Sequence, residues 1–180
     1  MSWVRSIGYG RFDSFALTPL SYKDPESKHE QAAMDTLEIL NFLPHRHPLL
    51  LVDRLTEFSE THAIGIKQLS RNEWFFQGHF DEAPEMPISL LLESMGQAGA
   101  AAVLARPENV GKLLFLAGLD QVTIEEAPEP VQTLRYEVQL LRIRGQSGKT
   151  LVRCFRGESE IASGEYTFVL SDAKENEVPA

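Results

Sequence analysis

Two side chains in the stretch FFQGHFDEAPEMPISLLLESMGQAGA, residues 75–100, are of types that perform acid–base chemistry. His79 lies between Gly78 and Phe80, and Glu93 follows fourteen residues later in the apolar run LLLESMGQAGAAAVLA. A histidine titrates near neutral pH and can act as a general base. A carboxyl among apolar side chains is expected to have a raised pKa and to hold a proton near pH 7. The alternatives are a structural histidine and a structural, hydrogen-bonded carboxyl.

The stretch that carries Glu93 predicts a long helix over residues 87–105, because it starts with a proline and continues with strong helix formers. It is apolar almost all round, which is typical of a helix surrounded by protein. Gln97 lies one turn after Glu93 on the same face and can orient the carboxyl. The first amides, at Ile88 and Ser89, have no intrahelical acceptor and can bind a developing oxyanion. Together these groups suit removal of a proton beside a carbonyl with loss of a hydroxyl.

The rest of the chain predicts an antiparallel sheet around this helix, which makes the fold class α+β. A short helix is expected at residues 37–43, and residues 61–70 alternate in polarity at first, as in a half-buried strand. Four later stretches are rich in β-branched and aromatic residues, and short turns between them indicate a meander. They are residues 113–124, 134–145, 149–159 and 161–171.

The chain of 180 residues divides into three parts. Residues 1–36 are expected to form an N-terminal extension, 37–171 a single domain, and 172–180 a frayed C-terminal tail. The start lacks the apolar core and cleavage site of a secretory signal, so none is expected. No charge-free apolar run reaches about 18 residues, so we expect no membrane span.

Composition excludes several functions. A formal net charge of −9 argues against nucleic acid as a partner. Cys154 is the only cysteine, so no intrachain disulfide is possible, which fits a cytoplasmic protein. His45 and His47 are spaced as a pair, but no further ligands accompany them at zinc spacing, and no metal is predicted.

Four motifs in order resemble the (3R)-3-hydroxyacyl-[acyl-carrier-protein] dehydratases of fatty-acid synthesis, of the FabZ/FabA type. They are LPHRHPLLLVDR (43–54), FFQGHF to MP (75–87), LLLESMGQAG (90–99) and LAGLDQ (116–121). The resemblance implies a hotdog fold, in which an antiparallel sheet wraps a long central helix. It also implies a homodimer with active sites at the subunit interface, often assembled as a trimer of dimers, and no metal or organic cofactor. The expected partner is an acyl carrier protein or CoA thioester.

The resemblance also assigns roles to residues. His79 and Glu93 match the family's catalytic pair, which acts across the interface, and Gln97 matches the glutamine that steadies the carboxyl. As a mechanism, we expect His79 to take the C2 proton and Glu93 to protonate the leaving hydroxyl. The Ile88 amide would polarise the thioester carbonyl. Further residues of these motifs are expected to orient or contact the substrate: Gly78, Phe80, Met86, Pro87 and Ser89.

The sequence departs from the family pattern around the same motif. Asp81 and Glu82 replace Pro-Gly, and Ile88 replaces the glycine after Met-Pro. Residues 123–132 are acidic where relatives tend to be basic. Two alternatives therefore stay open: a thioesterase on the same fold, and a non-catalytic acyl-binding subunit.

Overall fold

The computed structural model describes residues 33–80 and 82–172. The predictions for residues 1–32, for Asp81 and for residues 173–180 therefore lie outside the described residues. The folded part begins before residue 37, because Met34 exchanges two backbone hydrogen bonds with Leu55, at 2.8 and 2.9 Å. The short helix α1 (Thr36–Ile39) follows, and Asp35 caps it in a capping box. It begins one residue before the helix predicted at 37–43 and ends four residues earlier.

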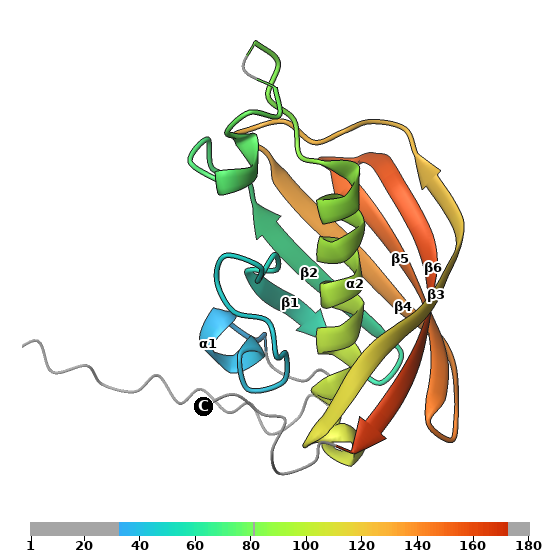
Figure 1. Ribbon diagram of the computed structural model, residues 1–180. Coiled ribbons are helices and arrows are strands. Elements are labelled where there is room, and N and C mark those ends of the chain that lie inside the picture. Colours follow the sequence, from blue (N-terminus) through green and yellow to red (C-terminus); the bar gives the residue numbers. More distant parts are fainter. Residues whose placement is uncertain (1–32, 81, 173–180) are drawn as a thin grey trace, which may run out of the picture.

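Six antiparallel strands form one sheet in the order β1-β2-β4-β5-β6-β3 (Figure 1). Their bounds are Arg54–Phe58 (β1), His62–Gln68 (β2), Lys112–Ile124 (β3), Thr133–Arg144 (β4), Ser147–Arg156 (β5) and Ser159–Asp172 (β6). Strands β4, β5 and β6 form the predicted meander. The prediction that β3 belongs to the same meander is wrong, because β3 pairs with β6 and lies at the sheet edge.

The connection between β3 and β4 explains this difference. Residues 125–132 contain Pro128 and Pro130, which have no amide hydrogen to donate to a hairpin ladder. The segment instead runs over one end of the sheet and carries the chain from the edge strand to a central one (Figure 1). As a result, β3 forms an edge of the sheet and its neighbour is β6, the last strand of the chain.

The long helix α2 (Ile88–Leu104) lies across the concave face of the sheet (Figure 1). Its second half is buried, and small residues permit close packing there: a Cβ at Gly99 would lie 3.3 Å from Oγ1 of Thr150. Its first turns are only partly covered, and Ser89 and Glu93 are exposed. The prediction of a helix surrounded by protein therefore holds for the second half of α2 alone.

Strand β2 is buried more completely than its alternating polarity indicated. Every residue from Ala63 to Lys67 is buried, because α2 covers one face and β1 and β4 flank the strand on both sides. Lys67 is only 6% exposed and pairs with Asp53 and Glu73 at 3.2 and 2.9 Å. Two 3₁₀ helices, Trp74–Phe76 (η1) and Pro107–Asn109 (η2), flank α2 in the chain. Among the described helices, none has the length and apolar character needed to cross a membrane.

Candidate active site

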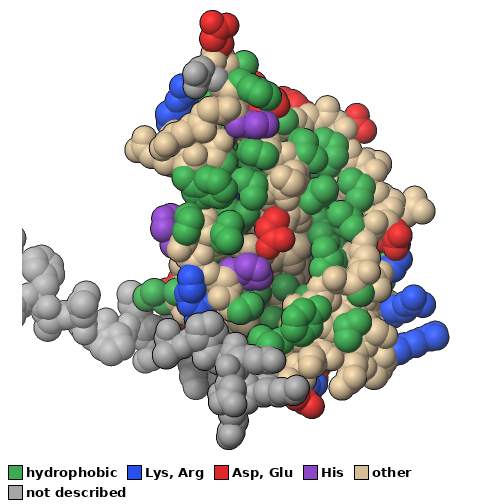
Figure 2. Space-filling view, viewed as in Figure 1, with side chains coloured by type: hydrophobic (Ala, Val, Ile, Leu, Met, Phe, Trp, Pro, Cys, Tyr) green, Lys and Arg blue, Asp and Glu red, His purple; other side chains and the backbone are tan. Residues whose placement is uncertain are grey.

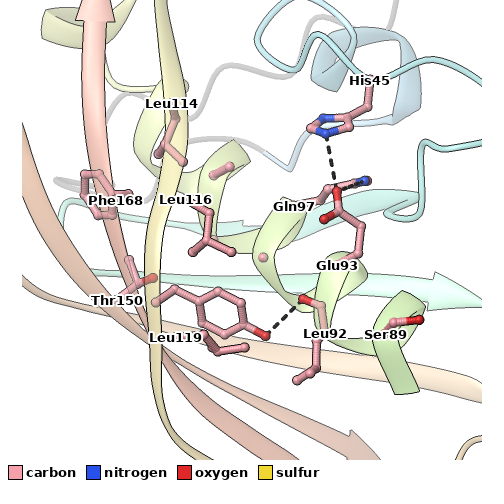
Figure 3. Close-up of a pocket in the computed structure, with 14 residues that line it drawn as sticks. His45, Ser89, Leu92, Glu93, Gln97, Leu114, Leu116, Leu119, Thr150 and Phe168 are labelled. Carbon is pink, nitrogen blue, oxygen red and sulfur yellow. Dashed lines mark hydrogen bonds and ion pairs between the residues drawn. The ribbon is translucent and has the colours of Figure 1, made fainter. Parts of the chain in front are cut away.

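A pocket of about 240 Å³ opens between α2 and the strands β3, β5 and β6 (Figure 3). Glu93, Gln97 and His45 lie on one side of it, and apolar side chains of the sheet lie on the other. The residues that line it are His45, Ser89, Leu92, Glu93, Gly96, Gln97, Gly99, Ala100, Leu114, Leu116, Leu119, Thr150, Tyr166 and Phe168. A carboxyl at the edge of a mostly apolar pocket is a suitable arrangement for acid–base chemistry on an acyl chain.

The Glu93 carboxyl is held by two neighbours. Its Oε1 accepts a hydrogen bond from Nε2 of Gln97 at 2.8 Å, which is the contact expected from their one-turn spacing. The same oxygen lies 3.3 Å from Nε2 of His45. Figure 3 shows both partners pointing at the carboxyl.

These contacts lower the pKa of Glu93. The hydrogen bond from His45 is the largest cause, partial burial opposes it, and Gln97 lowers the pKa further. The expectation that apolar surroundings raise this pKa is wrong for the chain alone. The side chain is 44% exposed, because the first turns of α2 face outward from the sheet.

Gln97 also ties the preceding loop to α2. Its Oε1 accepts from the backbone amide of Leu51, and its Nε2 donates to the carbonyl of Leu49, both at 2.8 Å. Ser94 donates to the carbonyl of Leu51 at 2.6 Å. These bonds fix the segment that carries His45 over the first half of the helix.

Sequence patterns do not predict His45 as a partner of Glu93. They indicate His45 and His47 only as a pair of candidate metal ligands. The structure separates the two, since His45 lies in the pocket wall while His47 is exposed. The one available signal is that His45 precedes the apolar run LLLV, whose Leu51 and Val52 are buried.

One ring nitrogen of His79 is held by the backbone. Its Nδ1 lies 3.0 Å from the backbone carbonyl of Glu85, and a carbonyl can only accept, so Nδ1 carries the hydrogen of this bond and Nε2 is the nitrogen left without a backbone partner. The ring stacks on Phe80 with centroids 4.4 Å apart. Gly78 has a φ of 86°, which favours glycine at this turn. His79 does not line the pocket of Glu93, so one chain does not bring the two together there.

The remaining predicted site residues lie at or near the start of α2. The prediction that Pro87 occupies the first helical position is off by one residue: Pro87 is the N-cap, and the helix begins at Ile88 with no side-chain cap. Ser89 lines the pocket. Phe80 is 56% exposed, whereas Met86 is fully buried and packs in the core. The expected substrate contact by the Met86 side chain therefore disagrees with this structure.

Comparison with known proteins identifies the family. The FabA-like domain family matches residues 43–163. The curated 3-hydroxyacyl-[acyl-carrier-protein] dehydratase FabZ of Natranaerobius thermophilus is 43% identical over 137 residues, 76% of this chain and 96% of the relative. The chain belongs to the FabA/FabZ dehydratase family. A FabZ relative from Bacillus cereus is 42% identical over 144 residues, which cover 79% of this chain and 99% of that protein.

Solved structures support the same fold for this FabA/FabZ family member. The dehydratase heterocomplex ApeI:P from Xenorhabdus doucetiae matches with a TM-score of 0.65 at 18% identity, over 77% of this chain and 93% of that one. The PaaI protein of E. coli, from the phenylacetic acid degradation operon, matches with a TM-score of 0.54 at 13% identity, over 69% and 83%. The prediction of a hotdog fold is confirmed.

Proposed function

We propose that this protein dehydrates (3R)-3-hydroxyacyl thioesters carried on acyl carrier protein, in fatty-acid biosynthesis. The products are a trans-2-enoyl thioester and water. The observation that carries the proposal is the Glu93 carboxyl at the edge of an apolar pocket, in a chain about 42% identical to FabZ dehydratases. The pocket accommodates the acyl chain, and the carboxyl faces the carbon that loses its hydroxyl.

The reaction needs a base, an acid and an oxyanion site. The lone pair on Nε2 of His79 takes the C2 proton, and the C–H electrons form the C2=C3 double bond. The C3–O bond breaks, and the hydroxyl leaves as water with a proton from Glu93. The free amide of Ile88 at the start of α2 stabilises the enolate-like thioester oxygen. Solvent returns the proton from His79 to Glu93 after the product leaves.

We infer that a second subunit completes the site, with His79 of one subunit against Glu93 of the other. The exposed edge of the sheet supports this. Hydrophobic side chains gather on the face that carries α2 and β3 (Figure 2), and Phe115 and Leu116 of β3 are 54% and 56% exposed. Among the described strands, β3 has a neighbour on one side only, and its free edge can extend the ladder across an interface. A trimer of such dimers is the larger assembly we expect.

Burial of the site by the second subunit would also explain how Glu93 comes to carry a proton. A proton donor must carry its proton when the substrate is bound, whereas the pKa of Glu93 is lowered in the exposed chain. Burial already opposes the two hydrogen bonds, and a second subunit with bound substrate would remove the remaining water. We expect this desolvation to raise the pKa of the carboxyl in the complex. We expect the reaction in the cytoplasm, and the single cysteine, which allows no intrachain disulfide, fits that compartment.

The test is turnover of 3-hydroxyacyl thioesters on acyl carrier protein and on CoA, across chain lengths. We expect enoyl formation by wild type and a loss of at least 100-fold in kcat for His79→Ala and for Glu93→Gln. Full activity in either variant would refute the assignment. Release of a free thiol would favour a thioesterase, and tight binding without turnover would favour an acyl-binding subunit.

A further inference from the structure

We propose that His45 is a positioning residue for the Glu93 carboxyl: with Gln97 it holds one oxygen, Oε1, and leaves Oε2 to exchange the proton with the substrate. The inference rests on the proposed function, in which Glu93 is the acid. It concerns a residue of the sequence PHRHP (44–48) that the predicted mechanism does not use.

The two donors converge on a single oxygen. Nε2 of Gln97 lies 2.8 Å from Oε1 of Glu93, and Nε2 of His45 lies 3.3 Å from the same atom. Within the described residues, Oε2 has no hydrogen-bond partner. A carboxyl fixed at one oxygen can rotate little about its Cγ–Cδ bond, so its second oxygen keeps a constant direction. Such fixed geometry lowers the cost of reaching the reactive arrangement.

The ring of His45 presents one usable donor to Glu93. Its Nδ1 is buried and has no hydrogen-bond partner among the described residues. Nε2 is the ring nitrogen that faces the carboxyl, 3.3 Å from Oε1. A hydrogen carried on Nε2 is therefore directed at Glu93, and the hydrogen bond from His45 lowers the pKa of the carboxyl.

The neighbourhood of His45 and Glu93 contains few other titratable groups. Arg46 adjoins His45 and donates to the carbonyls of Leu43 and His45 at 2.7 and 2.9 Å. On the sheet side, Tyr166 donates to the carbonyl of Leu92, and burial, Cys154 and Glu93 together raise its pKa. Tyr166 therefore stays neutral at the pH of the assays. In the proposed dimer, His79 of the second subunit also faces Glu93, so the titrations are compared between variants that all keep His79.

The experiment compares His45→Phe, which removes the donor, with His45→Gln, whose amide can donate from the position of Nε2. The control is His62→Phe, at the exposed start of β2. Two quantities are measured: the pKa of Glu93, by NMR with ¹³C-labelled glutamate assigned through Glu93→Gln, and the pH profiles of kcat and KM. His45→Ala replaces His45→Phe if the latter does not fold.

We expect the pKa of Glu93 to rise in His45→Phe, because a donor to the charged form is lost. The plateau kcat should fall about 10- to 100-fold with KM little changed, and the alkaline limb of kcat should move to higher pH. His45→Gln should keep the lower pKa and most of the rate. The proposal is overturned if His45→Phe leaves the titration of Glu93 unchanged, or if His45→Gln loses as much rate as His45→Phe. If wild type dehydrates no substrate while the titration still shifts, the proposed function fails and the positioning role stands.

Discussion

Gly96 on α2 lies directly against the ring of Tyr166 on β6, where an added Cβ would come within 3.2 Å of the ring carbon Cε1. Both residues line the pocket. The absence of a side chain at Gly96 therefore sets the separation of helix and sheet at this point. A methyl group there would push the ring into the pocket or narrow the path beside it.

We predict that Gly96→Ala impairs long acyl substrates more than short ones. KM should rise several-fold for long chains and change little for the shortest, because only long chains must pass the narrowed part of the pocket. The measurement is KM across a series of 3-hydroxyacyl chain lengths. Gly118→Ala is the matched control, since a Cβ there meets Thr167 at an ordinary 3.7 Å outside the pocket. An equal loss at every chain length would contradict the prediction.

Mixing two inactive variants tests whether the site is shared between subunits. His79→Ala and Glu93→Gln should each be inactive alone. Dimers formed from one subunit of each kind contain one intact site if the two residues come from different chains. Random reassembly at equal amounts should then restore about a quarter of wild-type activity, because about half the dimers are mixed and half their sites are intact. No recovery in verified mixed dimers would place both residues of a site in one chain.

Glu93 should also contribute to stability in a pH-dependent way. Its pKa in the folded chain lies below the ordinary 4.5, so its ionised form stabilises the fold above about pH 4.5. That contribution is lost as the pH falls through the lowered folded pKa. We expect the difference in free energy of unfolding between wild type and Glu93→Gln to shrink from about pH 7 to about pH 4. Urea unfolding of both proteins across this pH range measures the difference. A difference that grows on acidification would contradict the predicted direction.

Ser94 should be important for stability although it takes no part in the chemistry. Its hydroxyl donates to the carbonyl of Leu51, so the hydroxyl of fully buried Tyr136 must donate to Ser94, with both distances 2.6 Å. Ser94→Ala would leave two buried polar groups unpaired and should lower the free energy of unfolding by about 1–3 kcal/mol.

Two comparisons check that explanation of the Ser94 effect. The double variant Ser94→Ala, Tyr136→Phe should regain part of the loss, because it removes one unpaired hydroxyl. Ser89→Ala on the exposed side of α2 should have little effect on unfolding. Equal costs for the changes at Ser94 and Ser89 would contradict the role of the buried bonds.

Local patterns in the sequence predict the elements well and their partners poorly. The helix at 88–104 and all the later strands appear within a few residues of their predicted bounds, because helix formers and β-branched runs act locally. The place of β3 beside β6 depends on the route of residues 125–132 across the sheet, which no local pattern encodes.

In the site, too, contacts within one helix were predictable and contacts between distant segments were not. The hydrogen bond from Gln97 to Glu93 was predictable, because residues four apart share a helix face. The contact of His45 with Glu93 joins residues 48 apart, and it depends on the hydrogen bonds that Gln97 donates to Leu49 and accepts from Leu51, so spacing could not reveal it. The exposure of Glu93 depends on which part of α2 the sheet leaves uncovered. An apolar sequence around the carboxyl does not determine that.

The pairing of β3 with β6 has a consequence for synthesis. Lys112 at the start of β3 pairs with Asp172 at the end of β6, and Tyr166 and Phe168 of β6 complete the pocket. During translation, α2 and β3 are synthesised long before β6. Until then β3 has no neighbour in the sheet, and the apolar wall of the future pocket is open to water and to other chains. The pocket that would bind the substrate is thus the last part of the nascent chain to form. An mRNA truncated before codon 166 would yield a sheet without this pocket.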